Sequence, residues 1–488
     1  MSQIKMYLCA ALSAVLLAAA AEFPSLWFLS FGALYPLVCA LLWNGLSQKP
    51  LGKRLLAGAF LGLFFGFLYF SFCFRWLWGL MPGLNFAVGL LQALFFALFG
   101  LLSPFFTRRF TGCLFGLPAL WTGCELLRSL GPFGFTWYGL SDIQTPNLPL
   151  LQYASLFGCR FLDYAAVFLV CAFVLFFTDR NRLHRLKALG AVVLFAAVQT
   201  AGCLYIAPVR DADKTVRLVQ ANMDMNKKTD TEALRKHIRL SKKGPGADLI
   251  MWPETTLSLL VPVFEHSVSE ACRELGAPIV TGANVPMGEN YTNSAVLFSV
   301  KGRRMGQYDK CRLVPFGEYT PFKRFFKKAP NPELAEWEAA PGSKEAAVLK
   351  TGPFKIGVCL CSEASFTEPA RKQAKAGANV LAALSNDGWF GKSNAAYAHF
   401  RFARLRAVEN RRWFLFCTST GISGVVTPYG QIAARAPEGA ETALDSPFGF
   451  ETEKTLFTKT GDIFSPLCCL AALWLAAAGL WAGKKEKN

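Results

Sequence analysis

The sequence predicts a multi-pass α-helical membrane domain joined to a layered α/β domain. Of its 488 residues, 53% are hydrophobic and only 17% are charged, whereas ordinary soluble proteins carry about 25% charged residues. The apolar excess is concentrated in residues 6–206 and 464–482, while residues 208–462 have a soluble composition. In this polar stretch, short apolar runs alternate with charged helical segments, which is typical of a layered α/β fold.

Eight segments are predicted to span a membrane, because a helix needs about 20 apolar residues to cross the hydrocarbon core. They cover residues 6–22, 24–44, 55–78, 86–107, 111–128, 150–177, 186–206 and 463–482. Residues 131–149 are aromatic and rich in Gly and Pro, which predicts a loop or a re-entrant piece. The predicted domains are 1–207 with seven spans, 208–462 as the soluble domain, and 463–488 with the eighth span and a tail.

Residues 1–22 also have the features of a cleavable signal peptide. Lys5 precedes an apolar core, and Ala18 to Ala21 come directly before Glu22. Both interpretations, a retained first span and a cleaved leader, remain open. Cleavage would leave the orientation of the later spans unchanged.

The basic residues of the short loops predict the orientation of the chain, since Lys and Arg accumulate on the cytoplasmic side. Alternate loops are basic, and the intervening short loops carry almost no positive charge apart from Arg128. The basic loops contain Lys5; Lys49, Lys53 and Arg54; Arg108 and Arg109; Arg180, Arg182, Arg185 and Lys187; and Lys484, Lys485 and Lys487. Both termini are therefore expected inside and the 208–462 domain outside. This distribution explains part of the net charge of +18, and without a basic helix or stacking motif we expect no nucleic-acid binding.

The 15 cysteines follow neither a disulfide pattern nor a metal-site pattern. Ten lie in or beside the predicted spans, where Cys behaves as a small apolar residue. The soluble domain holds Cys272, Cys311, Cys359, Cys361 and Cys417. Their number is odd, their spacing is irregular, and no CxxC pair or His cluster accompanies them. We expect no metal and no other cofactor.

Eight strands and four helices are predicted in the soluble domain. The strands cover residues 217–221, 248–252, 278–282, 294–299, 356–360, 380–384, 413–417 and 424–427, and the helices cover 231–242, 264–275, 369–376 and 395–411. Because the strand segments are apolar throughout, we expect both faces of the sheets to be covered.

Three reactive residues, Glu254, Lys310 and Cys361, each follow an apolar strand-like run. A thiol at the end of a strand can stand exposed at the top of a sheet, with turn amides near a developing oxyanion. Glu254 could take the thiol proton, and Lys310 could stabilise the thiolate and the oxyanion. Each residue alone has an ordinary alternative: a core cysteine, a solvated or capping carboxylate, and a surface lysine. Alternation places Cys359 on the same side as Cys361, so at most one of the two thiols is expected past the strand.

These three residues, in this order and with their flanking motifs, resemble the nitrilase or carbon-nitrogen hydrolase superfamily. The membrane spans before and after narrow the resemblance to its membrane-embedded members, the apolipoprotein N-acyltransferases, and it covers nearly the whole chain. The matching motifs are Gly-Phe-Thr-Trp at 134–137, Val-Gln-Ala-Asn at 219–222, Trp-Pro-Glu at 252–254, Val-Pro-Phe-Gly-Glu-Tyr at 314–319, Ser-Asn-Asp-Gly-Trp-Phe-Gly at 385–391, the segment from His399 to Glu409, and Thr-Gly-Ile at 420–422.

The resemblance implies an αββα sandwich for the soluble domain and a role for each reactive residue. Glu254 is implied as the base, Lys310 as the oxyanion stabiliser and Cys361 as the nucleophile, with supporting roles for Glu318 and Glu363. The family usually has Tyr directly after the cysteine, where this chain has Ser362. It usually has Trp shortly after the Gln-x-Asn motif, where this chain has Lys227, Lys228 and Thr229. Both departures concern local substrate contacts and leave the three implied catalytic residues intact.

The implied reaction transfers an acyl chain from a membrane phospholipid to the N-terminal α-amine of diacylglyceryl-cysteine apolipoproteins through a Cys361 thioester. This is the last step of lipoprotein maturation, in the bacterial inner membrane with the catalytic domain on the periplasmic side. The implied partners are a phospholipid acyl donor and a diacylated apolipoprotein acceptor, and we expect a monomer. Two other classes stay open: a membrane-tethered nitrilase-type amidase acting on a small amide, and a catalytically silent membrane scaffold.

Residues 319–328 mix aromatic and cationic side chains directly after Glu318. Such side chains are favoured in the headgroup layer of a membrane, which suggests a lid that dips into it. A solvated basic turn is the alternative interpretation.

Overall fold

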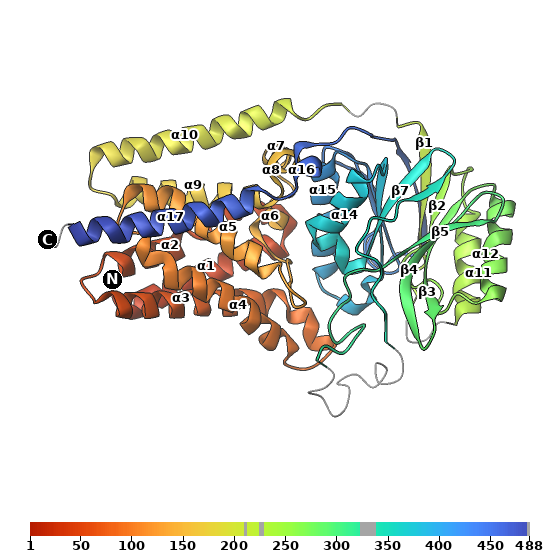
Figure 1. Ribbon diagram of the computed structural model, residues 1–488, viewed down its shortest axis with the longest axis horizontal. Coiled ribbons are helices and arrows are strands. Elements are labelled where there is room, and N and C mark those ends of the chain that lie inside the picture. The colour runs from red at the N-terminus through yellow and green to blue at the C-terminus, as the bar shows by residue number, and fades with distance from the viewer. Residues whose placement is uncertain (209–211, 224–228, 323–337, 486–488) are drawn as a thin grey trace. The chain divides into compact units, whose positions relative to one another are not determined.

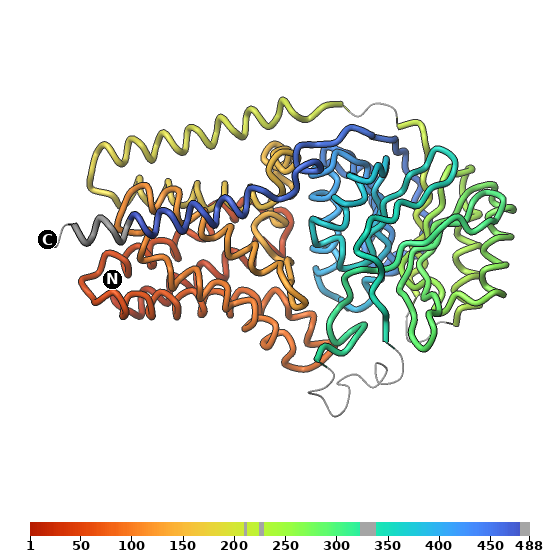
Figure 2. Tube along the Cα trace, in the orientation of Figure 1, coloured from red at the N-terminus to blue at the C-terminus, as the bar shows by residue number. Residues whose placement is uncertain are grey.

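The computed structural model describes residues 1–208, 212–223, 229–322 and 338–485, and the chain divides into two compact units. One unit contains Met1–Ile206 and Asp462–Asn488, and the other contains Ala207–Gly461. Figure 2 shows that the last helix returns to the helical unit in which the chain begins. The first unit is therefore built from both ends of the sequence.

The first unit is all helical (Figure 1). Its α-helices are α1 (Gln3–Glu22), α2 (Tyr35–Leu46), α3 (Leu51–Cys73), α4 (Leu84–Leu102), α5 (Leu117–Arg128), α6 (Leu140–Ile143), α7 (Leu148–Leu151), α8 (Ala154–Phe157), α9 (Arg160–Thr178), α10 (Arg182–Leu204) and α17 (Phe464–Lys485). Among the described residues, six helical segments are long and apolar enough to cross a membrane: Gln3–Glu22, Pro24–Leu46, Leu51–Cys73, Leu84–Phe105, Arg160–Thr178 and Arg182–Leu204. The predicted class of a multi-pass helical domain is confirmed.

The other two predicted spans, 111–128 and 463–482, are also helical. Residues 111–128 form a π-helical turn, Gly112–Gly116, followed by the 12-residue α5. The predicted span 463–482 coincides with α17, which covers Phe464–Lys485. The predicted span 150–177 is corrected, because the helix breaks at Gly158, whose φ of +83° favours glycine. Only the part that begins at Arg160 remains a span.

A buried ion pair positions the segment between α5 and α6. Arg128 donates to the Glu125 carboxylate at 2.8 Å and to the main-chain oxygen of Trp137 at 2.9 Å. Charged groups in an apolar helical unit are costly unless they are paired, so this pair holds the Gly-Phe-Thr-Trp motif against α5. Arg128 is thus a structural exception to the loop-charge pattern.

The second unit contains two six-stranded sheets. The first has the order β12-β1-β2-β3-β4-β5 and the second has the order β11-β10-β9-β8-β7-β6. The strands are β1 (Lys214–Gln220), β2 (Leu249–Met251), β3 (Ile279–Met287), β4 (Asn290–Phe298), β5 (Arg304–Asp309), β6 (Leu349–Thr351), β7 (Phe354–Leu360), β8 (Val380–Ser385), β9 (Phe414–Thr418), β10 (Gly424–Val426), β11 (Ile432–Arg435) and β12 (Thr442–Phe448). Strands β1, β2 and β3 are parallel, as are β7, β8 and β9.

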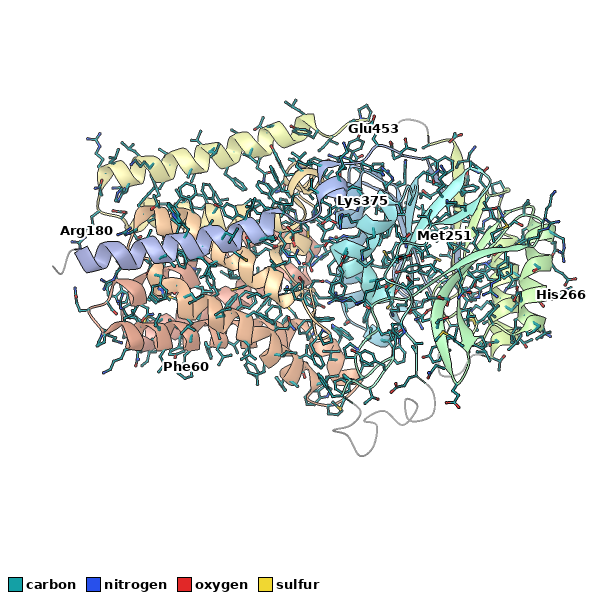
Figure 3. All side chains as sticks on the ribbon, in the orientation of Figure 1. Phe60, Arg180, Met251, His266, Lys375 and Glu453 are labelled. Atoms are coloured by element: carbon teal, nitrogen blue, oxygen red, sulfur yellow. The ribbon has the colours of Figure 1, made fainter. Side chains whose placement is uncertain are left out.

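Helices cover the outer face of each sheet. Figure 1 shows α11 (Asp230–Ser241) and α12 (Pro262–Leu275) outside the first sheet, and α14 (Thr367–Lys375) and α15 (Ala395–Asn410) outside the second. The short α16 (Leu456–Thr460) packs against α14 and α15. Residues such as Leu218, Met251, Val358 and Leu384 form one apolar core between the sheets. Met251 is fully buried there, whereas His266 lies on the exposed face of α12 (Figure 3).

This arrangement is the predicted αββα sandwich, and the fold class is confirmed. The four predicted helices lie within two residues of α11, α12, α14 and α15. Among the described residues, the strands absent from the prediction are β5, β6, β11 and β12. These strands are partly exposed and carry polar residues, so they lack the continuous apolar runs that identify buried strands.

Candidate active site

Strand register brings the candidate nucleophile to one end of the sandwich. In the second sheet Leu360 of β7 pairs with Leu384 of the parallel β8, so the residues that follow these strands are neighbours. Cys361 comes directly after β7 and begins a short 3-10 helix, Cys361–Ser365. Its φ of +48° lies in the left-handed region, which is unusual for a side chain other than glycine. This conformation turns the chain sharply where the strand ends.

Glu254 is buried and is held by donors from both sheets. It lies three residues after β2 and is 5% exposed. Its Oε1 accepts from Asn293 Nδ2 at 2.8 Å and from Lys310 Nζ at 3.3 Å, and its Oε2 accepts from the main-chain N–H of Asn386 at 3.0 Å. Because these donors occupy both carboxylate oxygens, the orientation of the group is well defined.

Lys310 is buried between two carboxylates. Its Nζ lies 2.9 Å from Glu318 Oε1 and 3.3 Å from Glu254 Oε1. Burial acts to lower the pKa of the Lys310 ammonium, but Glu318 and Glu254 outweigh burial and hold the pKa well above its ordinary value. The site therefore contains a permanent positive charge.

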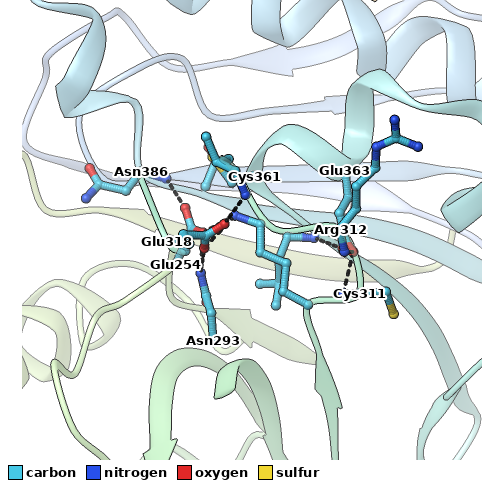
Figure 4. Close-up of polar contacts among 12 residues, drawn as sticks. Glu254, Asn293, Cys311, Arg312, Glu318, Cys361, Glu363 and Asn386 are labelled. Atoms are coloured by element: carbon cyan, nitrogen blue, oxygen red, sulfur yellow. Dashed lines mark hydrogen bonds and ion pairs between the residues drawn. The ribbon is translucent and has the colours of Figure 1, made fainter. Parts of the chain in front are cut away.

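The Cys361 thiol lies in the field of the same groups. Burial raises its pKa above the ordinary value and the Glu254 carboxylate raises it further, while Lys310 and a hydrogen bond with Ser385 lower it. Figure 4 shows Cys361, Glu254, Glu318 and Asn386 gathered at this place. The structure thus brings together the three residues that the sequence singles out, although 107 positions separate Glu254 from Cys361 in the numbering.

Glu318 and Glu363 support different parts of the site. Glu318 Oε1 accepts from Lys310 and from Asn293 Nδ2, and its Oε2 accepts from the Val314 N–H at 2.8 Å. Glu363 is fully buried and does not reach this cluster. It accepts from the N–H groups of Cys311, Arg312 and Leu360 and from the Tyr308 hydroxyl, at 2.8 to 3.0 Å. Glu363 therefore ties the chain after Lys310 to the end of β7.

We expect Glu363→Gln to destabilise this unit and slow the chemistry at Cys361. The amide retains one acceptor oxygen, and its NH₂ group would face N–H donors that the carboxylate now accepts. Leaving buried donors unpaired costs about 1–3 kcal/mol each, so the free energy of unfolding should fall by at least that amount. Thermal unfolding measures the effect, and Glu368→Gln, an exposed change on α14, is the control. Equal stability of the two variants would contradict this role.

Several residues of the site were absent from the sequence prediction or had no role in it. Asn293 was missed: it lies on β4, next to Lys310 across the sheet, and its carbonyl accepts from the Lys310 N–H. Its amide bridges both Glu254 and Glu318. Ser385, Asp387 and His399 belong to motifs that the sequence shows, but no spacing rule connects them with Cys361. Asn293 lies directly before the predicted strand 294–299, between the polar residues Thr292 and Ser294, so no local pattern marks it.

The two departures from the family pattern have different outcomes. Thr229 is the N-cap of α11, and its hydroxyl accepts from the Glu232 N–H at 3.2 Å, so it has a local structural role. Ser362 is half-buried in the 3-10 helix after Cys361. Lys227 and Lys228 lie outside the described residues, and so do residues 323–328 of the suggested lid.

Comparison with known proteins follows the division into two units. Residues 215–446 match the carbon-nitrogen hydrolase family, and residues 13–173 match the apolipoprotein N-acyltransferase N-terminal domain. An apolipoprotein N-acyltransferase of Geobacter metallireducens is 31% identical over 96% of this chain and 94% of its own length. Those of Shewanella oneidensis and Aquifex aeolicus are each 29% identical, over 92% and 86% of this chain and 91% and 95% of their own lengths.

Solved structures of the nitrilase superfamily resemble about half of the chain. An amidase of Nesterenkonia AN1 has a TM-score of 0.40 and 18% identity, with 50% of this chain and 93% of the amidase covered. A carbon-nitrogen hydrolase from Helicobacter pylori has a TM-score of 0.39 and 20% identity, with 48% and 88% covered.

Proposed function

This chain belongs to the apolipoprotein N-acyltransferase family, and we propose that it transfers an acyl chain from a membrane phospholipid to the N-terminal α-amine of diacylated apolipoproteins. The observation that carries the proposal is the buried Glu254–Lys310 pair beside the Cys361 thiol. A base, a fixed positive charge and a thiol are the groups that acyl transfer through a thioester requires.

In the first half-reaction, Glu254 takes the proton of the Cys361 thiol as the sulfur attacks the ester carbonyl of the phospholipid. Burial raises the thiol pKa, so little free thiolate is present at neutral pH, and proton transfer accompanies the attack. The Lys310 ammonium stabilises the oxyanion of the tetrahedral intermediate. The carbon–oxygen bond then breaks, and the lysophospholipid oxygen takes the proton from Glu254.

In the second half-reaction, the neutral α-amine of the apolipoprotein attacks the thioester carbonyl. Glu254 takes a proton from the attacking nitrogen, Lys310 again stabilises the oxyanion, and the carbon–sulfur bond breaks. The sulfur recovers its proton from Glu254. A thioester keeps its reactivity toward amines when water is scarce, and a site near lipid meets this condition.

The protein is a membrane protein with several apolar helices, which suits two lipid substrates. We place it in the bacterial inner membrane with Ala207–Gly461 on the periplasmic side, because the basic loops of the first unit alternate as the positive-inside rule requires. We further propose that residues 208–462 act as the catalytic domain, that residues 1–207 and 463–488 anchor it, and that one copy of the chain is sufficient.

Product analysis tests the proposal. The purified protein in detergent is incubated with a phospholipid that carries a labelled acyl chain and with a peptide that bears an N-terminal diacylglyceryl-cysteine. We expect labelled N-acyl peptide and one equivalent of lysophospholipid, and we expect no labelled peptide when the α-amine is acetylated beforehand. Free fatty acid without acylated peptide, or ammonia from a small amide, would instead support the amidase alternative.

A further inference from the structure

A buried histidine contacts the main chain of the candidate nucleophile. His399 Nε2 lies 3.1 Å from the carbonyl oxygen of Cys361, and His399 Nδ1 lies 2.9 Å from Asp387 Oδ1. The side chains of His399 and Asp387 are both fully buried. Since a carbonyl oxygen only accepts, a hydrogen bond to the Cys361 carbonyl requires Nε2 to be the donor.

The Cys361 backbone needs such an anchor. A residue other than glycine in the left-handed region costs on the order of 1–3 kcal/mol and persists only where its surroundings hold it there. Cys361 has a φ of +48°, and the direction of its carbonyl is set by the same turn that sets the direction of its thiol. A donor that forms a hydrogen bond with this carbonyl therefore also restrains the direction of the thiol.

Aromatic rings pack around His399, and Asp387, its hydrogen-bond partner, is itself held by a further hydrogen bond. The rings of Phe390, Phe402 and Phe416 meet its ring nearly edge-on, with centroids 5.8, 6.4 and 5.1 Å away. The Ser385 hydroxyl donates to Asp387 Oδ1 at 2.7 Å. Hydrogen bonds thus run from Ser385 through Asp387 and His399 to the Cys361 carbonyl.

Gly421 packs directly against the Asp387 side chain and restricts its movement. A Cβ atom at Gly421 would lie 2.2 Å from Asp387 Oδ2 and 2.7 Å from Asp387 Cβ. Only a glycine allows the backbone at this position to pack directly on the Asp387 side chain. Asp387 therefore has little room to rotate away from His399.

We propose that His399, oriented by Asp387, is a positioning residue that holds Cys361 in its left-handed conformation and so aims the thiol at the Glu254–Lys310 pair. His399 acts through the main chain of Cys361, because its Nε2 lies at hydrogen-bond distance from the Cys361 carbonyl and its Nδ1 at hydrogen-bond distance from Asp387. The inference rests on the proposed function only in taking Cys361 as the nucleophile.

Two amide substitutions separate the two contacts of the ring. His399→Gln can place its NH₂ near the position of Nε2 and keep a donor for the Cys361 carbonyl. His399→Asn can place its NH₂ near Nδ1 and keep only the contact with Asp387. Phe400→Leu, a buried change on the same helix next to His399, controls for a general loss of packing. Each full-length variant is purified in detergent, and its thermal unfolding is recorded.

The first readout is the rate at which iodoacetamide alkylates Cys361, measured by mass spectrometry of the peptide that contains it. This readout does not require lipid turnover. Because a displacement of about 1 Å can slow a reaction about 100-fold, we expect alkylation to be at least about tenfold slower in His399→Asn. We expect His399→Gln and Phe400→Leu to stay within about threefold of the natural protein. Rescue by glutamine distinguishes positioning from simple structural support.

The second readout is formation of the acyl-enzyme from phospholipid. We expect a lower maximal rate in His399→Asn with an unchanged half-saturating lipid concentration. Equal alkylation rates in His399→Asn, His399→Gln and the natural protein would overturn the inference, and so would a loss in Phe400→Leu as large as in His399→Asn. If neither histidine variant folds, Asp387→Asn takes their place, and alkylation at the natural rate in this variant would overturn the inference. Absence of acyl transfer by the natural protein would reject the proposed function and leave the alkylation result interpretable.

Discussion

Replacing Cys361 by serine is expected to abolish the acyl-enzyme and to reduce acyl transfer at least about 1,000-fold, because removal of a covalent nucleophile leaves only the residual effect of binding and oxyanion stabilisation. Serine would also be a much weaker nucleophile in this environment. Burial and Glu254 already raise the pKa of the thiol, and an alcohol in the same position would give up its proton far less readily.

Intact-mass measurement checks this expectation directly. The natural protein incubated with phospholipid should gain the mass of one acyl chain, and the gain should disappear when a diacylated peptide with a free α-amine is added. Cys359→Ala is the matched control, since Cys359 lies in β7, two residues before Cys361, and is fully buried in the sheet. An acyl adduct on the Cys361→Ser protein, or loss of the adduct in Cys359→Ala, would show that another residue is the nucleophile.

Replacing Lys310 by methionine is expected to cause the second largest loss. Its ammonium is the positive charge closest to Glu254 and Glu318 among the described contacts of these carboxylates. Loss of an oxyanion donor typically slows acyl transfer about 100- to 1,000-fold. The loss should exceed this range here, because Lys310 also holds Glu254 and Glu318 in place, and its removal leaves both buried carboxylates without their paired charge.

The same substitution should change the thiol and the stability of the unit. Lys310 lowers the pKa of Cys361, so its removal should raise that pKa and slow alkylation by iodoacetamide at neutral pH. Removing one partner of a buried ion pair costs about 3–5 kcal/mol, which thermal or denaturant unfolding can measure.

Two companion variants define the cause of the Lys310→Met effect. Adding Glu318→Gln removes one of the two opposed carboxylates, and this double variant should recover part of the stability but little of the acyl-transfer rate. Lys355→Met, on the exposed face of β7, should change neither quantity. Full activity of Lys310→Met would contradict the proposed oxyanion role.

The grouping of Glu254, Lys310 and Cys361 could be anticipated because each of them follows a strand-like run. Carboxyl ends of parallel strands meet at one edge of a sheet, so Cys361 after β7 could be placed near the residues after β8. The prediction did not extend to Asn293, whose amide joins Glu254 to Glu318. Its position depends on the antiparallel register of β4 and β5, which pairs Ser294 with Asp309 and which no local pattern specifies.

The sequence by itself determined that the chain has an apolar helical part and a more polar layered α/β part. Burial in lipid and burial between sheets select different residue patterns, and both patterns can be read from the sequence. It also determined which residue types could carry acyl transfer. Only the tertiary structure showed that a predicted span breaks at Gly158 and that four donors bind the Glu363 carboxylate. It also showed the hydrogen bonds that connect Ser385, Asp387 and His399 with the Cys361 carbonyl. Hydrogen bonds act over about 3 Å and depend on direction, so such contacts follow from the packing of distant segments and leave little periodic trace in the chain.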